Sequence, residues 1–401
     1  MIKRYIKRNI YLAKIKPFIN KNVIKVIVGQ RRVGKSYLLF QVMDELIKQG
    51  IKKDDIIYIN KELHEFEAIR DYNDLLAFIK QAAGNKKKYI FIDEIQDIVK
   101  FEKALRDLAA INKHDIYCTG SNANLLSSEL ATYLSGRYVE VEVFSLSYPE
   151  FLVFHKLKNT DKSLFQFIKF GGLPYLINLE LTEQVVYDYL KNIYNTILFK
   201  DVVKRYNIRH FDFLERLVEY LADNIGSLVS AKKISDFLKS QKIKMDPNIV
   251  LNYIHFLVSS FFIFKVQRSE VNGKKIFEIN EKYYFEDLGL RHSLIGYRQI
   301  DINKVLENLI FMHLKVSGYK ITVGQLGDKE IDFVGERKGE KIYIQAIYLI
   351  NSEAVKEREF GNLLAIKDNY PKLVVSMDKM TGGSVKGIKQ INILDFLSKL
   401  L

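Results

Sequence analysis

The sequence predicts an α/β protein that begins with a parallel sheet covered by helices and continues into further modules. Over residues 1–149, short β-branched and apolar runs alternate with longer amphipathic stretches. This alternation is typical of strands joined by crossover helices, a connection that makes neighbouring strands parallel. A chain of 401 residues, 48% of them hydrophobic, can form several compact units. With only five prolines, we expect short linkers between them.

The composition indicates which partners and which compartment to expect. A formal net charge of +14 favours anionic partners such as nucleic acid, acidic lipid or nucleotide phosphates, although a lysine-rich chain kept soluble by its charge is the alternative. The single cysteine, Cys118, excludes a disulfide within the chain, which favours the reducing cytoplasm. The most apolar stretch, residues 250–264, is short and is interrupted by Asn252 and His255, so we expect no membrane span.

A phosphate-binding loop is the strongest motif. The apolar run 23–28 leads into a segment that satisfies GxxxxGK[ST], and an amphipathic helix follows. Glycines let backbone amides point at a phosphate, Lys35 can reach the β and γ phosphates of ATP, and the Ser36 hydroxyl can hold Mg²⁺. The residues expected to contact ATP are Gly29, Gln30, Arg31, Arg32, Val33, Gly34, Lys35, Ser36 and Tyr37.

Two carboxylates follow a second apolar run. The strand expected at 89–92 ends in Asp93 and Glu94, at the sheet edge where parallel sheets bind ligands. We expect Asp93 to hold Mg²⁺ and Glu94 to orient the attacking water. A solvated acidic turn is the alternative, and the phosphate-binding loop upstream favours the catalytic interpretation.

Two further positions are candidates for catalysis. The strand expected at 115–119 leads to Ser121 and Asn122, which could bond a γ-phosphate or the lytic water, although a plain turn uses the same residue types. Arg137 follows a glycine and precedes another strand, where it could act as an arginine finger or be an ordinary surface arginine.

Together these motifs resemble the AAA+ superfamily over residues 1–204. The whole chain resembles prokaryotic AAA+ ATPases that carry a C-terminal uncharacterised domain with a restriction-endonuclease-like fold, in the segments GQRRVGKS, IFIDEIQD, TGSNANLL, YLSGRY, LSYPEFL and GGLP. The resemblance implies that Lys35 and Ser36 bind phosphate and metal and that Asp93 and Glu94 hydrolyse ATP. It also implies a helical lid over 150–204. Arg137 would serve the site of a neighbouring subunit, which implies a ring, with a hexamer as the candidate size.

Residues 205–285 have the pattern of a winged helix-turn-helix. Helices are expected over 211–222, 230–239 and 248–257, followed by a hairpin. The lysines expected to contact nucleic acid through its phosphates are Lys232, Lys233, Lys239, Lys242 and Lys244. Winged helices also serve as packing modules, so DNA contact and protein packing remain alternatives.

Residues 286–401 resemble a restriction-endonuclease-like domain. An active member needs an aspartate, a second acid and a lysine to bind magnesium and steer water. Asp332 is present, but Gln345 stands in place of the second acid and Ile347 in place of the lysine. We therefore expect a degenerate domain without nuclease activity.

The four expected domains are the AAA+ P-loop core at 1–149, the lid at 150–204, the winged helix at 205–285 and the nuclease-like domain at 286–401. The function expected is Mg²⁺-dependent ATP hydrolysis by a cytoplasmic homo-oligomer that binds DNA and remodels or translocates it. The alternative is an ATP-dependent signalling or defence switch that acts through protein contacts without DNA.

Overall fold

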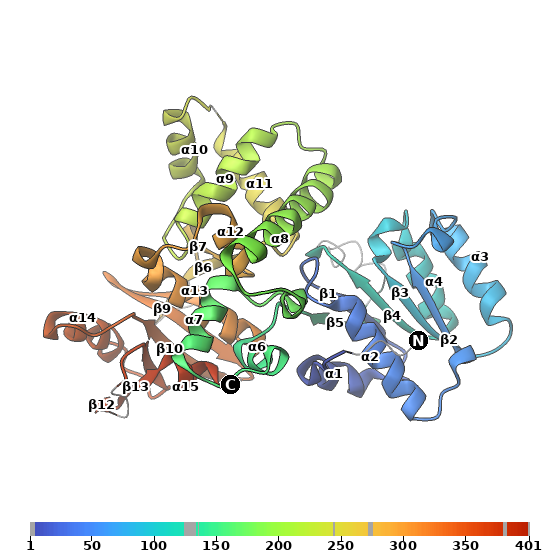
Figure 1. The fold of residues 1–401 in the computed structure, drawn as a ribbon, viewed down its shortest axis with the longest axis horizontal. Coiled ribbons are helices and arrows are strands. Elements are labelled where there is room, and N and C mark those ends of the chain that lie inside the picture. The colour runs from blue at the N-terminus through green and yellow to red at the C-terminus, as the bar shows by residue number, and fades with distance from the viewer. Residues whose placement is uncertain are drawn as a thin grey trace. The chain divides into compact units, whose positions relative to one another are not determined.

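The computed structural model describes residues 5–123, 134, 136–243, 245–271, 276–379 and 383–399 (Figure 1). The chain divides into two compact units, each with its own sheet. The first unit contains Met1–Phe144 with Ser259–Phe261, and the second contains Ser145–Val258 with Phe262–Leu401. None of the helices in the described residues combines the length and the apolar character that a membrane span requires.

The first unit is built on a five-stranded parallel sheet, as the sequence predicts. The strand order is β2-β3-β4-β1-β5, so β4 lies between β1 and β3. Every residue of β1, β3 and β4 is buried, because helices cover both faces of the sheet. The strands are β1 Ile24–Val28, β2 Ile56–Asn60, β3 Tyr89–Asp93, β4 Asp115–Gly120 and β5 Tyr138–Glu142.

The strand order determines which face each helix covers. The chain crosses from β1 to the edge strand β2 and then returns through β3 and β4. Because such crossovers are right-handed, α2 covers one face while α3 and α4 cover the other, and α1 packs on α2 (Figure 1). These helices are α1 Asn9–Ile15, α2 Lys35–Lys48, α3 Tyr72–Ala83 and α4 Phe101–Ile111.

A buried ion pair joins β1 to β4 at the amino end of the sheet. The Lys25 ammonium donates to the Asp115 carboxylate, and both side chains are almost completely buried. Asp115 also accepts hydrogen bonds from the Asn20 amide and the Tyr117 hydroxyl, each at 2.9 Å. Burial lowers the pKa of Lys25, and the charge of Asp115 opposes that change. Both charges are therefore compensated inside the sheet.

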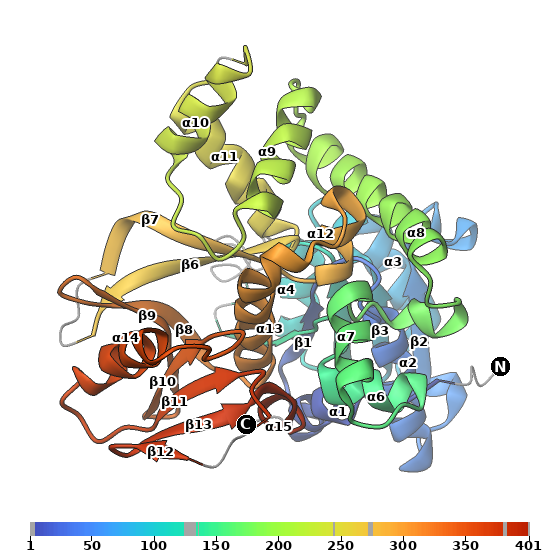
Figure 2. The same cartoon turned by 60° about the vertical axis from the view of Figure 1, so that its left-hand side comes forward.

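The second unit begins with a group of helices that encloses α12. Helix α12, Leu288–Ile295, packs against α7, α8 and α9 (Figure 2). A Cβ atom on Gly289 would lie 2.1 Å from the carbonyl oxygen of Phe170, so the backbones approach too closely for any side chain there. The surrounding helices are α6 Tyr148–His155, α7 Asp161–Phe170, α8 Glu183–Thr196 with its π-helical continuation Ile197–Lys204, and α9 Phe211–Asp223.

The elements expected in a winged helix all occur. After α9 come α10, Ala231–Ser240, and α11, Pro247–Ser259, and then the antiparallel hairpin of β6 and β7. Ser230 caps α10, as its position before the helix predicts. Val229 forms an isolated antiparallel bridge with Glu281 of β7. The winged-helix identity and the four domain bounds remain predictions.

The sheet of the second unit crosses the boundary that we expected at residue 285. Its order is β12-β13-β11-β10-β9-β8-β6-β7, and β6 pairs in parallel with β8. Helices α13, Ile302–Val316, and α14, Glu353–Leu364, pack on it. The hairpin therefore shares one sheet with the C-terminal strands. The strands are β6 Ile263–Glu270, β7 Ile276–Phe285, β8 Lys320–Leu326, β9 Lys329–Arg337, β10 Glu340–Ala346, β11 Lys372–Ser376, β12 Ser384–Val385 and β13 Ile388–Asn392, and α15, Ile393–Leu397, follows.

Candidate nucleotide site

The phosphate-binding loop connects β1 to α2, as the motif predicts. Gly29 has φ 150°, and a Cβ atom there would lie 2.0 Å from the carbonyl oxygen of Val143. Gly34 precedes α2 with φ 99°, in the left-handed region that favours glycine. Both glycines are therefore needed to bring this backbone from the strand into the helix.

The side chain of Lys35 lies back along the loop. It is buried, and its Nζ donates to the carbonyl oxygens of Gly29 at 3.0 Å and Gln30 at 2.9 Å. The same ammonium is 4.0 Å from a carboxylate oxygen of Glu94. The lysine of the loop and the second acidic residue therefore occupy one site.

Asp93 ends β3 and is surrounded by hydroxyl groups. Its carboxylate accepts hydrogen bonds from Thr119, from Ser36 and, at 3.1 Å, from Tyr58. Burial raises the pKa of Asp93, the charge of Glu94 adds to the rise, and these three bonds oppose it. The adjacent Ser36 hydroxyl and Asp93 carboxylate are oxygen donors of the kind that Mg²⁺ prefers, so these two residues fit the expected metal.

Thr119 orients both acids, and the sequence reasoning missed it. Its hydroxyl donates to the Asp93 carboxylate and accepts the backbone N–H of Glu94 at 3.0 Å. Glu94 has φ 54°, a conformation uncommon outside glycine, and Gln96 donates to its carboxylate. The parallel register that places Ile92 beside Cys118 also places Asp93 beside Thr119, but finding it requires knowing that β3 and β4 are neighbours.

The candidate sensors follow β4, between the loop and the acids. Ser121 and Asn122 are both almost completely buried. Gln30 of the loop is also buried, and neither polar atom of its amide has a hydrogen-bond partner among the described residues. These three side chains bring polar groups into the buried part of the site.

The remaining loop residues differ in how far they are exposed. Arg31 pairs with Glu62 at 3.1 Å, and Val33 is fully buried. Arg32, with φ 70°, and Tyr37 are exposed or half exposed. Of the expected ATP contacts, Lys35 and Ser36 thus contact the two acidic residues.

Arg137 does not lie in this site. It is exposed, and its carbonyl oxygen accepts the N–H of Ile24 at 2.9 Å, at the amino ends of β5 and β1. The loop leaves the carboxyl end of β1, whose five residues span about 16 Å. The backbone of Arg137 therefore lies at the end of β1 opposite to the loop.

The lysines expected to contact nucleic acid lie on and after α10. Lys232, Lys233, Lys239 and Lys242 are exposed, and Lys244 lies outside the described residues. The exposed face of α11 differs from this surface, because it carries no lysine or arginine. The exposed residues of α11 are Pro247, Asn248, Leu251, Asn252 and His255.

Of the three positions considered for a nuclease site, Asp332 lies beside a lysine that we did not expect. Lys282 of β7 is buried, with its Nζ 2.7 Å from Glu307, 2.9 Å from Glu330 and 3.9 Å from Asp332. Burial lowers the pKa of Lys282, but the charges of the three carboxylates outweigh that effect and raise it overall. Burial and the charge of Glu307 raise the pKa of Asp332. The ammonium therefore occupies the middle of the carboxylate cluster.

Gln345 and Ile347 take structural roles. The Gln345 amide accepts the N–H of Asp332 and donates to Glu359, each at 2.8 Å. Ile347 belongs to the hydrophobic core beneath α14. Within the described residues, no group of three or more histidine, cysteine or acidic side chains has the arrangement of a metal site. The loss of nuclease activity remains a prediction.

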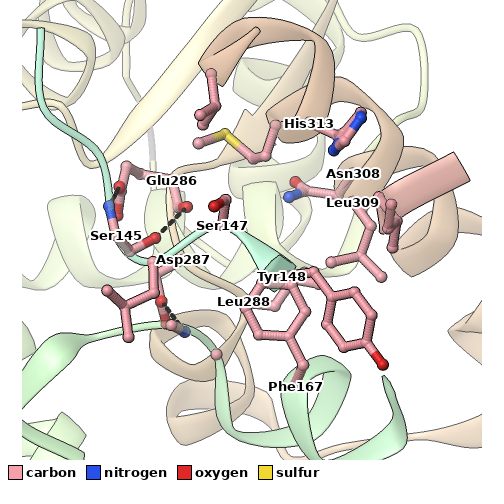
Figure 3. Close-up of a pocket in the computed structure, with 16 residues that line it drawn as sticks. Ser145, Ser147, Tyr148, Phe167, Glu286, Asp287, Leu288, Asn308, Leu309 and His313 are labelled. Carbon is pink, nitrogen blue, oxygen red and sulfur yellow. Dashed lines mark hydrogen bonds between the residues drawn. The ribbon is translucent and has the colours of Figure 1, made fainter. Parts of the chain in front are cut away.

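The second unit contains a pocket that is too small for a nucleotide. Its volume is about 40 Å³, enough for a few water molecules. The Asp287 carboxylate accepts the N–H of Gly172 at 2.7 Å, and burial raises the pKa of Asp287 to about 6 (Figure 3). Asn308 pairs with both backbone groups of Phe285. These bonds join Gly172 and Asn308 to the segment 285–287.

Comparison with known proteins agrees with this fold and site. A family model described as "AAA domain" matches residues 21–152, and a "Domain of unknown function (DUF8612)" matches residues 161–301. The Walker-type ATPase PABY2304 of Pyrococcus abyssi is similar in fold, with a TM-score of 0.50 and 15% identity over 73% of this chain and 96% of that one.

Two whole-chain relatives are uncharacterized proteins. One, from Haemophilus influenzae, is 36% identical over 99% of this chain and 100% of its own length. The other, from Methanocaldococcus jannaschii, is 32% identical over 90% of this chain and 84% of its own. The first unit thus contains an AAA domain, with a fold similar to that of a Walker-type ATPase. The chain belongs to the same family as these two relatives.

Replacing Lys282 tests its role in the carboxylate cluster. Lys282→Met leaves three partly buried carboxylates without their buried cation, so we expect the free energy of unfolding to fall by about 3 kcal/mol in urea titrations followed by circular dichroism. The matched control is Lys265→Met on β6, whose ion pair with Glu281 is partly exposed and should contribute less than about 1 kcal/mol. Equal losses in the two variants would contradict the assignment.

Proposed function

We propose that this chain is a magnesium-dependent ATPase that works as a homo-oligomer and uses ATP turnover to remodel or translocate DNA. The observation that carries the proposal is the convergence of Lys35, Ser36, Asp93 and Glu94 at the carboxyl edge of one parallel sheet. Glycine-directed backbone amides and a lysine suit a triphosphate, and a pair of acids suits a metal and a water molecule.

Each residue has a separate task in the proposed reaction. The loop amides and the Lys35 ammonium bind the β and γ phosphates. Ser36 and Asp93 would hold Mg²⁺, which supplies positive charge to the phosphates when it is bound. Glu94 orients the attacking water and accepts its proton, while Thr119 fixes the backbone of Glu94 and the carboxylate of Asp93. In this proposal, Ser121, Asn122 and the Gln30 amide respond to the γ-phosphate.

The position of Arg137 supports an oligomer. An exposed arginine at the end of β1 opposite to its own loop is suited to contact a phosphate bound by another subunit. An arginine supplied in this way increases P-loop hydrolysis about 10³- to 10⁵-fold. We therefore propose slow turnover by the monomer and fast turnover by a ring.

The exposed lysines of α10 support DNA as the partner, because each phosphate contact adds a salt-sensitive increment to affinity. The exposed face of α11, which has no cation, favours a second candidate, a switch that acts through protein contacts. Both candidates share the ATPase site and differ in what the C-terminal half binds.

Two variants test the site. Lys35→Ala removes the charge that holds the phosphates and should abolish ATP binding. Glu94→Gln should retain binding and lower turnover at least about 100-fold, because it removes the group that prepares the water. Binding by fluorescent nucleotide titration and phosphate release measure the two effects. Equal loss of binding in both variants would overturn the separate roles.

Mixing subunits tests Arg137. Neither Arg137→Ala nor Lys35→Ala protein should hydrolyse ATP at an appreciable rate alone. A mixture should recover part of the wild-type rate, because each intact loop can receive an arginine from a neighbour. Phosphate release is followed as the ratio of the two proteins varies, with each variant mixed with itself as the control. A mixture no faster than its components would assign Arg137 a role within its own chain.

DNA stimulation separates the two candidate functions. Single-stranded, duplex or branched DNA should raise the ATPase rate at near-physiological salt, and the effect should weaken as salt rises. Replacing Lys232, Lys233, Lys239 and Lys242 by glutamine should reduce stimulation while the rate without DNA stays unchanged. If the protein hydrolyses ATP but no DNA form binds or stimulates it, the protein-contact switch is the better description.

A further inference from the structure

Arg8 is a buried arginine that lies outside the phosphate-binding loop in the sequence and contacts its backbone. It precedes α1, and only 3% of the residue is exposed. Its Nη1 donates to the carbonyl oxygen of Val33 at 2.9 Å and to that of Phe144 at 2.8 Å. The guanidinium also lies over the ring of Tyr11, 4.5 Å from the ring centre. Arg8 therefore connects the N-terminal segment, the loop and the end of β5.

The Val33 contact determines the direction of the next amide. No peptide bond among the described residues is cis, so the Val33 carbonyl and the Gly34 N–H point in opposite directions. Arg8 holds the carbonyl toward the outer side of the loop, and the Gly34 N–H then faces the inner side. Inward amides at the start of a helix are the groups that bind phosphate.

The beginning of the loop, at Gly29, packs against the segment that also contains Phe144. The carbonyl oxygen of Val143 lies against Gly29, where a Cβ atom would meet it at 2.0 Å. Arg8 holds the following residue, Phe144. The entry of the loop thus packs against Val143 directly, and its exit is linked to Phe144 through the guanidinium of Arg8.

We propose that Arg8 is a positioning residue of the nucleotide site: it orients the Val33–Gly34 peptide for phosphate and places a permanent positive charge behind the loop. The inference rests on the proposed ATPase function. Hydrogen bonds from a charged donor are stronger than neutral ones, and a guanidinium remains charged when it is buried. Its attraction for phosphate is larger in this buried setting than in water.

The N-terminal segment has other anchors, so removing the guanidinium should not detach it. The Tyr5 hydroxyl bonds Asp44, the Lys7 ammonium donates to Glu45 at 2.7 Å, and the backbone N–H of Arg8 donates to the Gln41 amide oxygen at 2.9 Å. Tyr11, Leu12 and Ile15 of α1 are buried. A variant at Arg8 can therefore report on the nucleotide site in a folded protein.

The test uses Arg8→Met, which keeps the length and loses the charge, and Arg8→Lys, which keeps the charge but not the planar fork. We expect Arg8→Met to raise the dissociation constant of ATP at least about tenfold, and Arg8→Lys to lie between it and the wild type. The KM should rise more than kcat falls. Lys7→Met is the matched control, because its ion pair with Glu45 lies on the surface, and it should bind ATP normally.

The outcomes separate the inference from the proposed function. If the wild type does not bind ATP, the ATPase proposal itself is wrong. If the wild type binds and Arg8→Met has the same dissociation constant within about twofold, Arg8 is only structural and the inference is wrong. The unfolding midpoint without nucleotide is measured alongside. Should Arg8→Met fail to fold, Arg8→Lys decides: unchanged ATP affinity overturns the inference and weakened affinity supports it.

Discussion

One hydroxyl group links the two acidic residues of the nucleotide site. Thr119 donates to the carboxylate of Asp93 and accepts the N–H of Glu94, so the backbone turn after β3 is fixed by β4. This arrangement depends on the sheet order, in which β4 lies between the loop strand β1 and the acidic strand β3. The buried pair of Lys25 and Asp115 holds β1 beside β4 at the other end of the same strands. The distance between Lys35 and the acidic residues Asp93 and Glu94 therefore depends on the order and pairing of all the strands between them.

The sequence predicts the local parts of this site well. The strand, glycine loop and helix around Lys35 form as expected, because glycine spacing and apolar periodicity are local signals. Asp93 and Glu94 lie at the sheet edge because parallel strands end together. Thr119, Tyr58 and Arg8 were not predicted. Each reaches the site through strand neighbours or through residues far away in the chain, and a single sequence does not contain that order.

In the C-terminal half, too, the sequence predicts the individual elements but not which strands pair. Helices α9, α10 and α11 and the hairpin follow the expected pattern, but β6 pairs with β8 and extends the sheet of the following segment. The sequence reasoning looked for a lysine at position 347, where an isoleucine fills the core. The structure supplies a cation from β7 instead, because Lys282 lies beside Glu307 and Glu330 once the sheet is assembled. Only the tertiary fold brings those three residues together.

The close packing around α12 has a consequence for how the protein can be divided. Gly289 lies against the backbone of Phe170, and Gly171 lies against the side chain of Asp287, in each case too closely for a side chain on the glycine. Together with the hydrogen bond from Gly172 to Asp287, these contacts join the helices after residue 145 to the segment after residue 286. A truncated protein that ends at residue 285 would lose the partner of these glycines and the strand that pairs with β6. Its unpaired sheet edge would promote self-association. The second unit is therefore best expressed as one continuous segment, residues 145–401.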